Sequence, residues 1–246
     1  MTIKRAIILS AGQGSRLLPL TAERPKCLIE VGGRSILDHQ IDALAAAGID
    51  AITVVGGYLV DQIEAHVDNR SCGPAIEVRF NPFWAAASSI GSVWIARDRL
   101  DGPFLLLNGD TVYEPALISD CLARFGAGIN LVVERVAMAE DDDMRVVVEG
   151  DRVVEVGKAL PIARAGHRSL GIIGTVAADG GGYGRTLDLV LHGENGAMRF
   201  HHAVVDQLAH AGGVRAVEVS PMHWQEIDRP EDIASWAYAH PNNRAR

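Results

Sequence analysis

A buried strand followed at once by a glycine-rich loop opens this chain and most limits how it can fold. Residues 6–37 read AIILSAGQGSRLLPLTAERPKCLIEVGGRSIL. The apolar run 7–9 is typical of a strand that is covered on both faces. Gly12 and Gly14 then predict a sharp turn whose backbone N–H groups point outward and can meet an anion. The stretch therefore predicts a strand–loop–helix unit with an anion site on its loop.

Two cations, Arg16 and Lys26, lie in the same loop. Their charge beside outward-facing N–H groups suits the phosphates of a nucleoside triphosphate. The two common phosphate loops do not match. The dinucleotide fingerprint needs a glycine three residues after Gly14, where this chain has Leu17, and a glycine followed directly by Lys and Ser or Thr is absent. The glycines alone are equally compatible with a tight turn between a strand and a helix.

Strands and helices alternate through the first half of the chain. Apolar patterns predict strands over residues 4–10, 51–55, 76–80 and 104–107. Helical spacing predicts helices between them, over residues 35–48, 60–67 and 86–99. Such alternation favours βαβ units and a mainly parallel sheet, so we expect an α/β fold.

The second half is richer in short strands. We expect strands over residues 130–136, 145–149, 153–156, 170–176 and 214–219. Helices are predicted over residues 186–191, 198–211 and 230–239. Because no linker-like segment or internal repeat interrupts the chain, we expect one domain over 1–246. It would have a nucleotide-binding half to about residue 107 and a second half over about 108–240.

Composition narrows the partners. The formal net charge is −8 and no stretch is basic, which argues against nucleic acid and anionic membranes as partners. No apolar run is long enough for a membrane span or a secretion signal. The cysteines at 27, 72 and 121 lack metal or redox spacing, as expected in a reducing cytoplasm. An acidic protein that handles anionic substrates would concentrate its cations locally and would need a divalent metal.

The N-terminal string as a whole carries more information than its glycines. The pattern GxGxRLxPLT at 12–21, followed by PKxL at 25–28, resembles the signature of the sugar-1-phosphate nucleotidylyltransferase superfamily. This resemblance implies a Rossmann-like nucleotidylyltransferase fold, with a mixed, mainly parallel sheet flanked by helices. For the second half of the chain, over about 108–240, it implies acceptor binding. It also implies nucleotide-binding roles for Ala11, Gly12, Gly14, Ser15, Arg16, Lys26, Asn81, Ser88 and Gly109.

Two acidic positions are candidate metal ligands. Asp110 follows the buried run 104–107, and ligands of open α/β sheets bind at the carboxyl ends of strands. Taken alone, Asp110 could equally be a turn residue. Asp228 lies in EIDRPED at 226–232, where Pro230 and the acids after it are good chemistry for a helix start. The superfamily has a metal-binding Asp in each setting, so the resemblance implies one Mg²⁺ held by Asp110 and Asp228.

The acceptor half offers fewer specific residues. Lys158 follows the predicted strand 153–156, and a lone lysine at a strand end is usually solvated. Its position ahead of Gly171 resembles the segment whose lysine holds the acceptor phosphate in the superfamily. Lys158, Gly171 and Trp224 are therefore the candidate substrate-binding residues. The histidines at 192, 201 and 202 have no i, i+4 pairing and are predicted to be surface or core residues. The glycine-rich stretch 179–184 is predicted to be a surface loop, with a lid as the alternative.

Two segments are similar to phosphocholine and related alcohol-phosphate cytidylyltransferases. They are Asn81 with SSIGS at 88–92, and DDDMRV at 141–146. Helix N-capping is the structural alternative for Ser88. The chain departs from those relatives at GHRS, residues 166–169, where an acid is replaced by His and Arg, and it lacks an evident aromatic cage for a quaternary amine. We therefore expect an acceptor other than choline phosphate, such as a polyol or cyclitol phosphate or a phosphonate.

Together these resemblances imply transfer of CMP from CTP to a small phosphorylated acceptor, with Mg²⁺ as cofactor. Arg16, Lys26 and Lys158 would be the catalytic residues, acting by positioning and by neutralising charge. One alternative is a sugar-1-phosphate enzyme that uses UTP, dTTP or another NTP. A non-catalytic nucleotide-sensing homologue is the alternative of another class. The acceptor and a homo-oligomeric state stay open.

Overall fold

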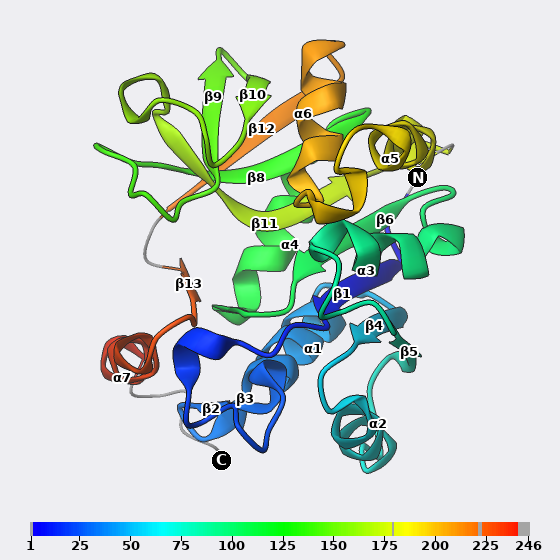
Figure 1. The fold of residues 1–246 in the computed structure, drawn as a ribbon, viewed down its shortest axis with the longest axis vertical. Coiled ribbons are helices and arrows are strands. Elements are labelled where there is room, and N and C mark those ends of the chain that lie inside the picture. The colour runs from blue at the N-terminus through cyan, green and yellow to red at the C-terminus, as the bar shows by residue number, and fades with distance from the viewer. Residues whose placement is uncertain (1, 179, 221–222, 241–246) are drawn as a thin grey trace.

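The computed structural model describes residues 2–178, 180–220 and 223–240. A nine-stranded sheet runs through the molecule in the order β5-β4-β1-β6-β11-β8-β12-β10-β9 (Figure 1). Its strands are β1 (Arg5–Ser10), β4 (Ala51–Gly56), β5 (Ala75–Phe80), β6 (Phe104–Asn108), β8 (Ile129–Arg135), β9 (Arg145–Glu149), β10 (Arg152–Val156), β11 (His167–Thr175) and β12 (Val214–Val219). Strands β5, β4, β1 and β6 are mutually parallel, as are β8 and β12, and β11 joins the two groups by antiparallel pairing.

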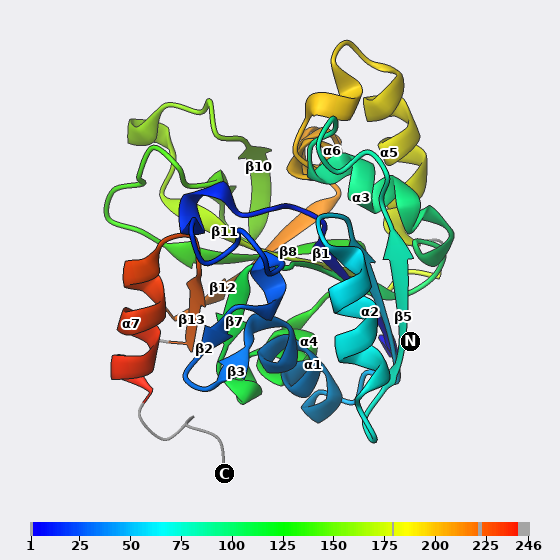
Figure 2. The same ribbon diagram turned by 60° about the horizontal axis from the view of Figure 1, so that its bottom comes forward.

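Helices cover both faces of this sheet, as Figures 1 and 2 show. The covering helices are α1 (Ile36–Ala46), α2 (Val60–Asp68), α3 (Ser89–Ile95), α4 (Pro115–Arg124), α5 (Tyr183–His192) and α6 (His202–His210), and a further helix, α7 (Pro230–Ala239), packs in a separate small cluster. Helices α1, α2 and α4 pack on one face, and α3, α5 and α6 on the other. The predicted α/β fold, a mixed, mainly parallel sheet with flanking helices, is confirmed.

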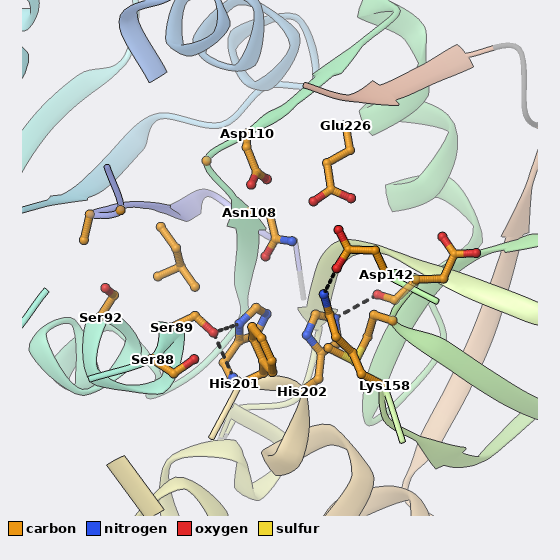
Figure 3. Close-up of a pocket in the computed structure, with 18 of the residues that line it drawn as sticks. Ser88, Ser89, Ser92, Asn108, Asp110, Asp142, Lys158, His201, His202 and Glu226 are labelled. Carbon is orange, nitrogen blue, oxygen red and sulfur yellow. Dashed lines mark hydrogen bonds and ion pairs between the residues drawn. The ribbon is translucent and has the colours of Figure 1, made fainter. Parts of the chain in front are cut away.

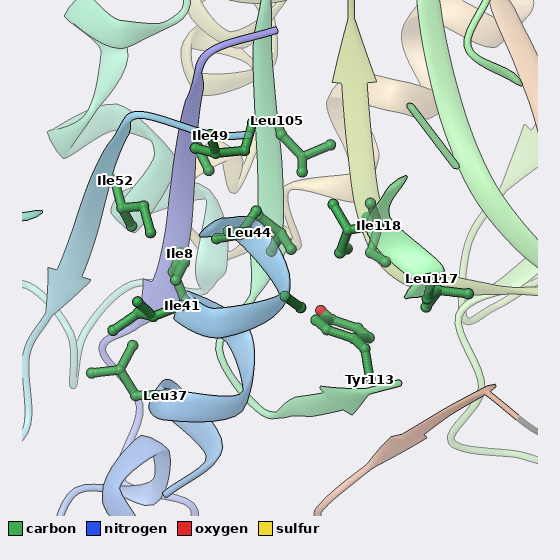
Figure 4. Packing of buried hydrophobic residues seen from close by; sticks show 14 of the residues in the cluster. Ile8, Leu37, Ile41, Leu44, Ile49, Ile52, Leu105, Tyr113, Leu117 and Ile118 are labelled. Atoms are coloured by element: carbon green, nitrogen blue, oxygen red, sulfur yellow. The ribbon is translucent and has the colours of Figure 1, made fainter. Parts of the chain in front are cut away.

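The buried strands supply side chains to both faces because successive residues of a strand point in opposite directions. Ile8 of β1 joins the cluster under α1 and α4, whereas its neighbour Ile7 joins the cluster under α3, α5 and α6. Figure 4 shows the first cluster, in which Leu37, Ile41 and Leu44 of α1 lie against the sheet. A strand covered twice in this way reads as a continuous apolar run, which is why β1 and β6 are recognisable in the sequence.

Some predicted boundaries are wrong. The helix predicted over 86–99 is shorter, with α3 followed by a separate 3₁₀ turn at Arg97–Arg99. Helix α6 begins at His202, not at residue 198. Helix α4 was not predicted, although Leu117, Ile118 and Cys121 are buried at helical spacing.

Two short ribbons, also absent from the predictions, complete the strand set. Strand β2 (Glu30–Val31) pairs with β3 (Arg34–Ser35), and β7 (Thr111–Tyr113) pairs with β13 (Trp224–Glu226).

The division of the chain into one domain with two halves stays a prediction. Among the described residues, no helix combines the length and apolar character that a membrane crossing requires.

Candidate active site

A cavity of about 270 Å³ opens at the carboxyl ends of β1 and β6. Ala11 and Gly12 line it after β1, and Gly109 and Asp110 line it after β6. The opposite part is lined by residues 142–144, Lys158, residues 168–169 and residues 200–202. Figure 3 shows side chains from these separate segments converging on one pocket. The pocket therefore joins the predicted nucleotide-binding and acceptor-binding halves.

The glycine-rich loop shapes one wall of this pocket. Gly14 has a left-handed φ of 71°, and a Cβ there would lie 2.9 Å from Cδ of Lys26. Ser15 begins a 3₁₀ turn over Ser15–Leu17. Within the part of the chain that the structure describes, Ala11, Gly12 and Arg16 line the pocket, whereas Gly14 and Ser15 do not. Gly14 thus serves the site indirectly, since its lack of a side chain lets the stem of Lys26 pack against the loop.

Lys26 links the two predicted metal ligands. Its Nζ donates to Oδ2 of Asp110 at 2.8 Å and also bonds to Oδ1 of Asp228. The Lys26 side chain is only 12% exposed. Burial by itself would lower the pKa of Lys26, but the two carboxylates outweigh it and the pKa is raised. Lys26 is therefore a charged, positioned group at neutral pH.

Arg16 extends this charge cluster across the pocket. One guanidinium nitrogen donates to Oδ2 of Asp228 at 2.5 Å, and another bonds to Asp142. The fold thus brings together Arg16, Lys26, Asp110 and Asp228, which the sequence had proposed as partners from widely separated segments.

Pairing of β7 with β13 is what joins Asp110 to Asp228. Thr111 lies opposite Glu226 in this ribbon, and the N–H of Ile227 donates to the carbonyl of Asp110 at 2.8 Å. Just beyond, Asp232 accepts from the N–H groups of residues 228 and 229, at 2.8 and 2.7 Å. The predicted helix start is therefore confirmed, with Asp232 as the capping acid. This leaves the carboxylate of Asp228 to face Lys26 and Arg16.

A third carboxylate, Glu226, belongs to the same cluster but was missed by the sequence interpretation. Asp110, Glu226 and Asp228 each offer an oxygen, and these atoms lie within 4.8 Å of one another. Glu226 borders the pocket, and desolvation of its carboxyl together with the negative charge of the two aspartates raises its pKa. The missed signal is the spacing Glu-Ile-Asp, because residues two apart on a strand point to the same side.

This carboxylate cluster fits a divalent cation. Among the described residues, Oδ1 of Asp110 is buried and has no hydrogen-bond partner. The crowded carboxyls also resist full ionisation, as the raised pKa of Glu226 shows. Carboxylate oxygens are the protein ligands that Mg²⁺ prefers, so a metal here would satisfy both deficits.

At the other end of the pocket, Lys158 is held by Asp142. Its Nζ donates to Oδ1 of Asp142 at 2.6 Å and lies 5.1 Å from the ring centre of Phe200. Hydrogen bonds from Lys158 and Arg16 lower the pKa of Asp142 to about 2. Asp142 was predicted only as part of the segment 141–146, and in the fold it connects the lysine of the acceptor half with the arginine of the nucleotide half.

Comparison with known proteins identifies the family. A sequence profile of the Nucleotidyl transferase family matches residues 5–151, more than half of the chain. The chain belongs to this family. CMP-5′-(3-aminopropyl)phosphonate synthase of Streptomyces rubellomurinus is 29% identical over 263 residues, which cover 98% of this chain and 40% of that protein. CTP:phosphoglutamine cytidylyltransferase of Campylobacter jejuni is 52% identical over 63 residues, covering 26% of this chain and 25% of that protein.

Solved structures of the nucleotidyl transferase fold agree. The inositol-1-phosphate CTP transferase from T. maritima superposes with a TM-score of 0.80 at 18% identity, covering 98% of both chains. The CTP:phosphocholine cytidylyltransferase from Streptococcus pneumoniae gives 0.79 at 20% identity, covering 96% of this chain and 97% of that one. These likenesses confirm the fold, and the family match confirms the resemblance predicted from the sequence. The chain spans half or less of the length of the curated relatives it matches.

In this nucleotidyl transferase, Gly171 lies directly against Asn108, a residue that lines the pocket. It has a φ of 70°, and a Cβ there would lie 2.3 Å from Cγ of Asn108, which lines the pocket. Gly171 itself is not among the lining residues that the structure describes. We infer that its role is steric, because any side chain would displace Asn108.

Trp224 lines the pocket from β13 and is nearly buried. The guanidinium of Arg168 lies 4.8 Å from the centre of its ring. Arg168 in turn donates to Glu134 at 3.0 Å and to Asp143 at 3.3 Å. Trp224 therefore already carries a cation on its face.

Asn81 and Ser88 line the pocket near the start of α3. The amide of Asn81 is buried, donates to Oγ of Ser92 at 3.1 Å and accepts from the N–H of Phe83 at 2.9 Å. Ser88 precedes α3, but its side chain makes no capping hydrogen bond. The capping alternative for Ser88 is therefore wrong, and its hydroxyl remains a candidate for ligand contact.

Proposed function

We propose that this chain is a Mg²⁺-dependent cytidylyltransferase. It would transfer CMP from CTP to a phosphorylated alcohol or a phosphonate and release pyrophosphate. The observation that carries this proposal is the arrangement of one pocket. Arg16, Asp110 and Glu226 line one end of it, Lys158 lines the other, and Lys26 is hydrogen-bonded to Asp110 just outside the lining. Relatives named for cytidylyl transfer to phosphorylated acceptors and phosphonates support the choice of CTP and of acceptor class.

The proposed chemistry needs positioning more than proton transfer. An oxygen of the acceptor phosphate or phosphonate attacks the α-phosphorus of CTP in line and forms the new P–O bond. The bond from the α-phosphorus to the oxygen that bridges to the β-phosphate breaks, and pyrophosphate leaves with that electron pair. Because the attacking oxygen is already anionic, no general base is required.

Each cation of the pocket would then have a task. Arg16 and Lys26 would neutralise the triphosphate and the departing pyrophosphate. Lys158 would hold and orient the acceptor phosphate, exchanging its present partner Asp142 for the phosphate oxygens. Asp110 and Asp228, with Glu226 beside them, would hold Mg²⁺. A bound Mg²⁺ supplies charge neutralisation at the phosphates and polarises the α-phosphorus.

A sugar-1-phosphate enzyme that uses another NTP is the nearest rival. N-acetylmuramate alpha-1-phosphate uridylyltransferase of Caulobacter vibrioides is 34% identical over 113 residues, which cover 45% of this chain and 47% of that protein. A non-catalytic nucleotide sensor is the rival of another class. It is disfavoured because a sensor need not keep the acceptor lysine together with both phosphate cations and both aspartates.

One assay separates these possibilities. Pyrophosphate release is measured for CTP, UTP, dTTP and ATP against a panel of phosphorylated alcohols, phosphonates and sugar 1-phosphates, with Mg²⁺ and with EDTA. We expect turnover with CTP and an alcohol phosphate or phosphonate, and none in EDTA. Preference for UTP or dTTP with a sugar 1-phosphate would establish the rival enzyme. Nucleotide binding by calorimetry without turnover would establish the sensor.

A further inference from the structure

Two histidines line the acceptor end of the pocket, and the proposed reaction uses neither of them. His201 and His202 are 2% and 3% exposed. Figure 3 shows their imidazoles close together, near Lys158 and on the opposite side of the pocket from Asp110 and Glu226. Their ring centres are 4.3 Å apart. Buried polar rings at a ligand pocket need partners, so the hydrogen bonds of each ring decide what it can recognise.

A serine fixes each ring. Oγ of Ser89 accepts the backbone N–H of His201 at 3.1 Å and lies 3.0 Å from Nδ1 of the same residue. Oγ of Ser169 accepts the N–H of Gly171 at 3.0 Å and lies 2.9 Å from Nε2 of His202. Each hydroxyl accepts a hydrogen bond from a backbone N–H and still has its own proton to donate, and the imidazole nitrogen is an acceptor within reach of that proton.

The two serines favour one tautomer of each ring. With serine as the donor to Nδ1 of His201 and to Nε2 of His202, the protons lie on the other nitrogen of each ring. Those two atoms, Nε2 of His201 and Nδ1 of His202, are buried and have no hydrogen-bond partner among the described residues. The pocket wall thus contains two unsatisfied N–H donors. An oxygen atom that accepts a hydrogen bond is the group that would satisfy them.

Both rings are neutral at pH 7. Burial lowers the pKa of His201 to about 4. Burial lowers the pKa of His202 as well, and the neighbouring His201 and Lys158 lower it further. The donors therefore present no net charge, which favours an uncharged oxygen of the acceptor over a second anionic group.

Near Lys158, the described residues that could hold an organic cation already hold protein cations. The ring of Trp224 faces the guanidinium of Arg168, and the ring of Phe200 faces the ammonium of Lys158. The acids nearby are also paired, Asp142 with Lys158 and Arg16, and Asp143 with Arg168. A trimethylammonium head would have to displace one of these cations.

We propose that His201 and His202 form an oxygen-recognition subsite for the organic part of the acceptor. The preferred acceptor would carry a hydroxyl or a carboxamide oxygen in addition to its phosphate or phosphonate. This inference rests on the proposed cytidylyl transfer and narrows its acceptor class.

The test compares acceptors of matched size. The second-order rate constant kcat/KM for pyrophosphate release, at saturating CTP and Mg²⁺, is measured with glycerol 3-phosphate, glycolamide phosphate, propyl phosphate and choline phosphate. Propyl phosphate is the control that lacks the oxygen of the first two. We expect kcat/KM for at least one oxygen-bearing acceptor to exceed that for propyl phosphate roughly tenfold or more. Propyl phosphate lacks the oxygen, so it leaves the buried donors unpaired. The better of the two identifies the oxygen as hydroxyl or carboxamide.

Variants assign that preference to the rings. His201→Phe and His202→Phe keep a planar ring but remove the donor, so they should raise KM for the oxygen-bearing acceptor and bring the ratio to propyl phosphate towards one. His201→Gln and His202→Gln retain an N–H donor and should keep part of the ratio. KM for CTP should stay near the wild-type value in all four. Circular dichroism identifies any variant that fails to fold. If a variant does not fold, the ratio of kcat/KM between the oxygen-bearing acceptor and propyl phosphate in the wild type still tests the subsite.

The outcomes separate this inference from the function on which it rests. One outcome is turnover with CTP in which kcat/KM for propyl or choline phosphate equals or exceeds that for the oxygen-bearing acceptors. This outcome would agree with the proposed cytidylyltransferase and overturn the subsite. An unchanged ratio in folded Phe variants would also overturn it. Absence of pyrophosphate release with every acceptor and every NTP would remove the proposed function and the subsite together.

Discussion

The two ends of the pocket hold their cations differently. Lys26, beside the end of the pocket that we propose binds the nucleotide (the nucleotide end), is 12% exposed and bridges Asp110 and Asp228, which are themselves largely covered. Lys158, at the acceptor end, is 34% exposed and pairs with Asp142, whose side chain is half exposed. Ion pairs that are shielded from water are less screened and cost more to break than exposed ones. The nucleotide end is therefore a pre-assembled charge cluster, whereas Lys158 can exchange its partner at little cost.

The two ends also differ in how the chain builds them. The nucleotide end is fixed by the carboxyl ends of β1 and β6 and by the β7–β13 ribbon. The acceptor end is assembled from the segments around residues 142–144, 158, 168 and 201, three of which lie between or at the ends of strands. Because loops tolerate change better than packed strands, the acceptor end is where specificity can vary within one family.

Removing Lys26 tests the pre-assembled end and should have the largest effect. Lys26→Met is expected to reduce the rate of pyrophosphate release on the order of a hundredfold to a thousandfold, because a positioned cation at the transferring phosphates is lost. It also leaves Asp110 and Asp228 without their shared partner. The variant should therefore unfold at a lower temperature than the wild type in EDTA and gain more from added Mg²⁺. The matched control is Lys4→Met, since Lys4 is exposed and far from the pocket. A near-wild-type rate for Lys26→Met would contradict the mechanism.

Removing Lys158 tests the exchangeable end. Lys158→Met should raise KM for the acceptor roughly ten- to hundredfold, the value of one charge-assisted hydrogen bond. KM for CTP should change little, because Lys158 pairs with Asp142 and not with the cluster around Asp110. Steady-state kinetics with each substrate varied in turn would show this split. Equal increases in both KM values would mean that the two ends do not act separately.

The buried imidazoles predict a pH dependence of stability. His201 has a pKa of about 4 in the fold and about 6.5 when unfolded, so between these values the unfolded chain binds more protons and stability falls as pH falls. From pH 7 to pH 5 the contribution of His201 should fall by about 2 kcal/mol. Urea unfolding of the wild type and of His201→Gln at both pH values separates the contribution of His201 from those of the other titrating groups.

The stability difference between the wild type and His201→Gln should change with pH in one direction. The free energy of unfolding of the variant, relative to that of the wild type, should be higher at pH 5 than at pH 7. His192→Gln, at an exposed histidine, should show no such change. A pH-independent difference between the wild type and His201→Gln would mean that the ring is not held neutral by burial.

Releasing Asp142 should have the smallest effect. Asp142→Asn frees Arg16 and Lys158 from a shared, half-exposed partner, and exposed ion pairs contribute about 1 kcal/mol or less. We expect KM for CTP and for the acceptor to fall by at most about fivefold. Salt should weaken the difference. A large rise in either KM would show that Asp142 binds substrate and does not merely hold the empty site together.

The sequence by itself determined the parts of this protein that local patterns encode. Apolar runs covered on both faces indicated β1 and β6, and the acids after Pro230 indicated the start of α7. Family resemblance of the loop at 12–28 and of the segments around Asp110, Lys158 and Asp228 singled out those residues. In the fold, Arg16, Asp110 and Lys158 line one pocket, and Lys26 and Asp228 are bonded to residues that line it. The catalytic and binding roles of these residues stay predictions. Such positions were recognisable because each lies at the end of a strand or in a loop whose residue types are restricted locally.

Tertiary structure alone decided what these residues contact. The β7–β13 ribbon, formed by segments more than a hundred residues apart, brings Glu226 beside Asp110 and Asp228. Asp142 and Arg16 meet across a similar separation, and so do His201 and Ser89. No local sequence pattern predicts such pairs, because an acid or a histidine has the same secondary-structure propensity whether it is solvated or buried. Burial and long-range pairing set the protonation of those groups, and with it the chemistry they can recognise.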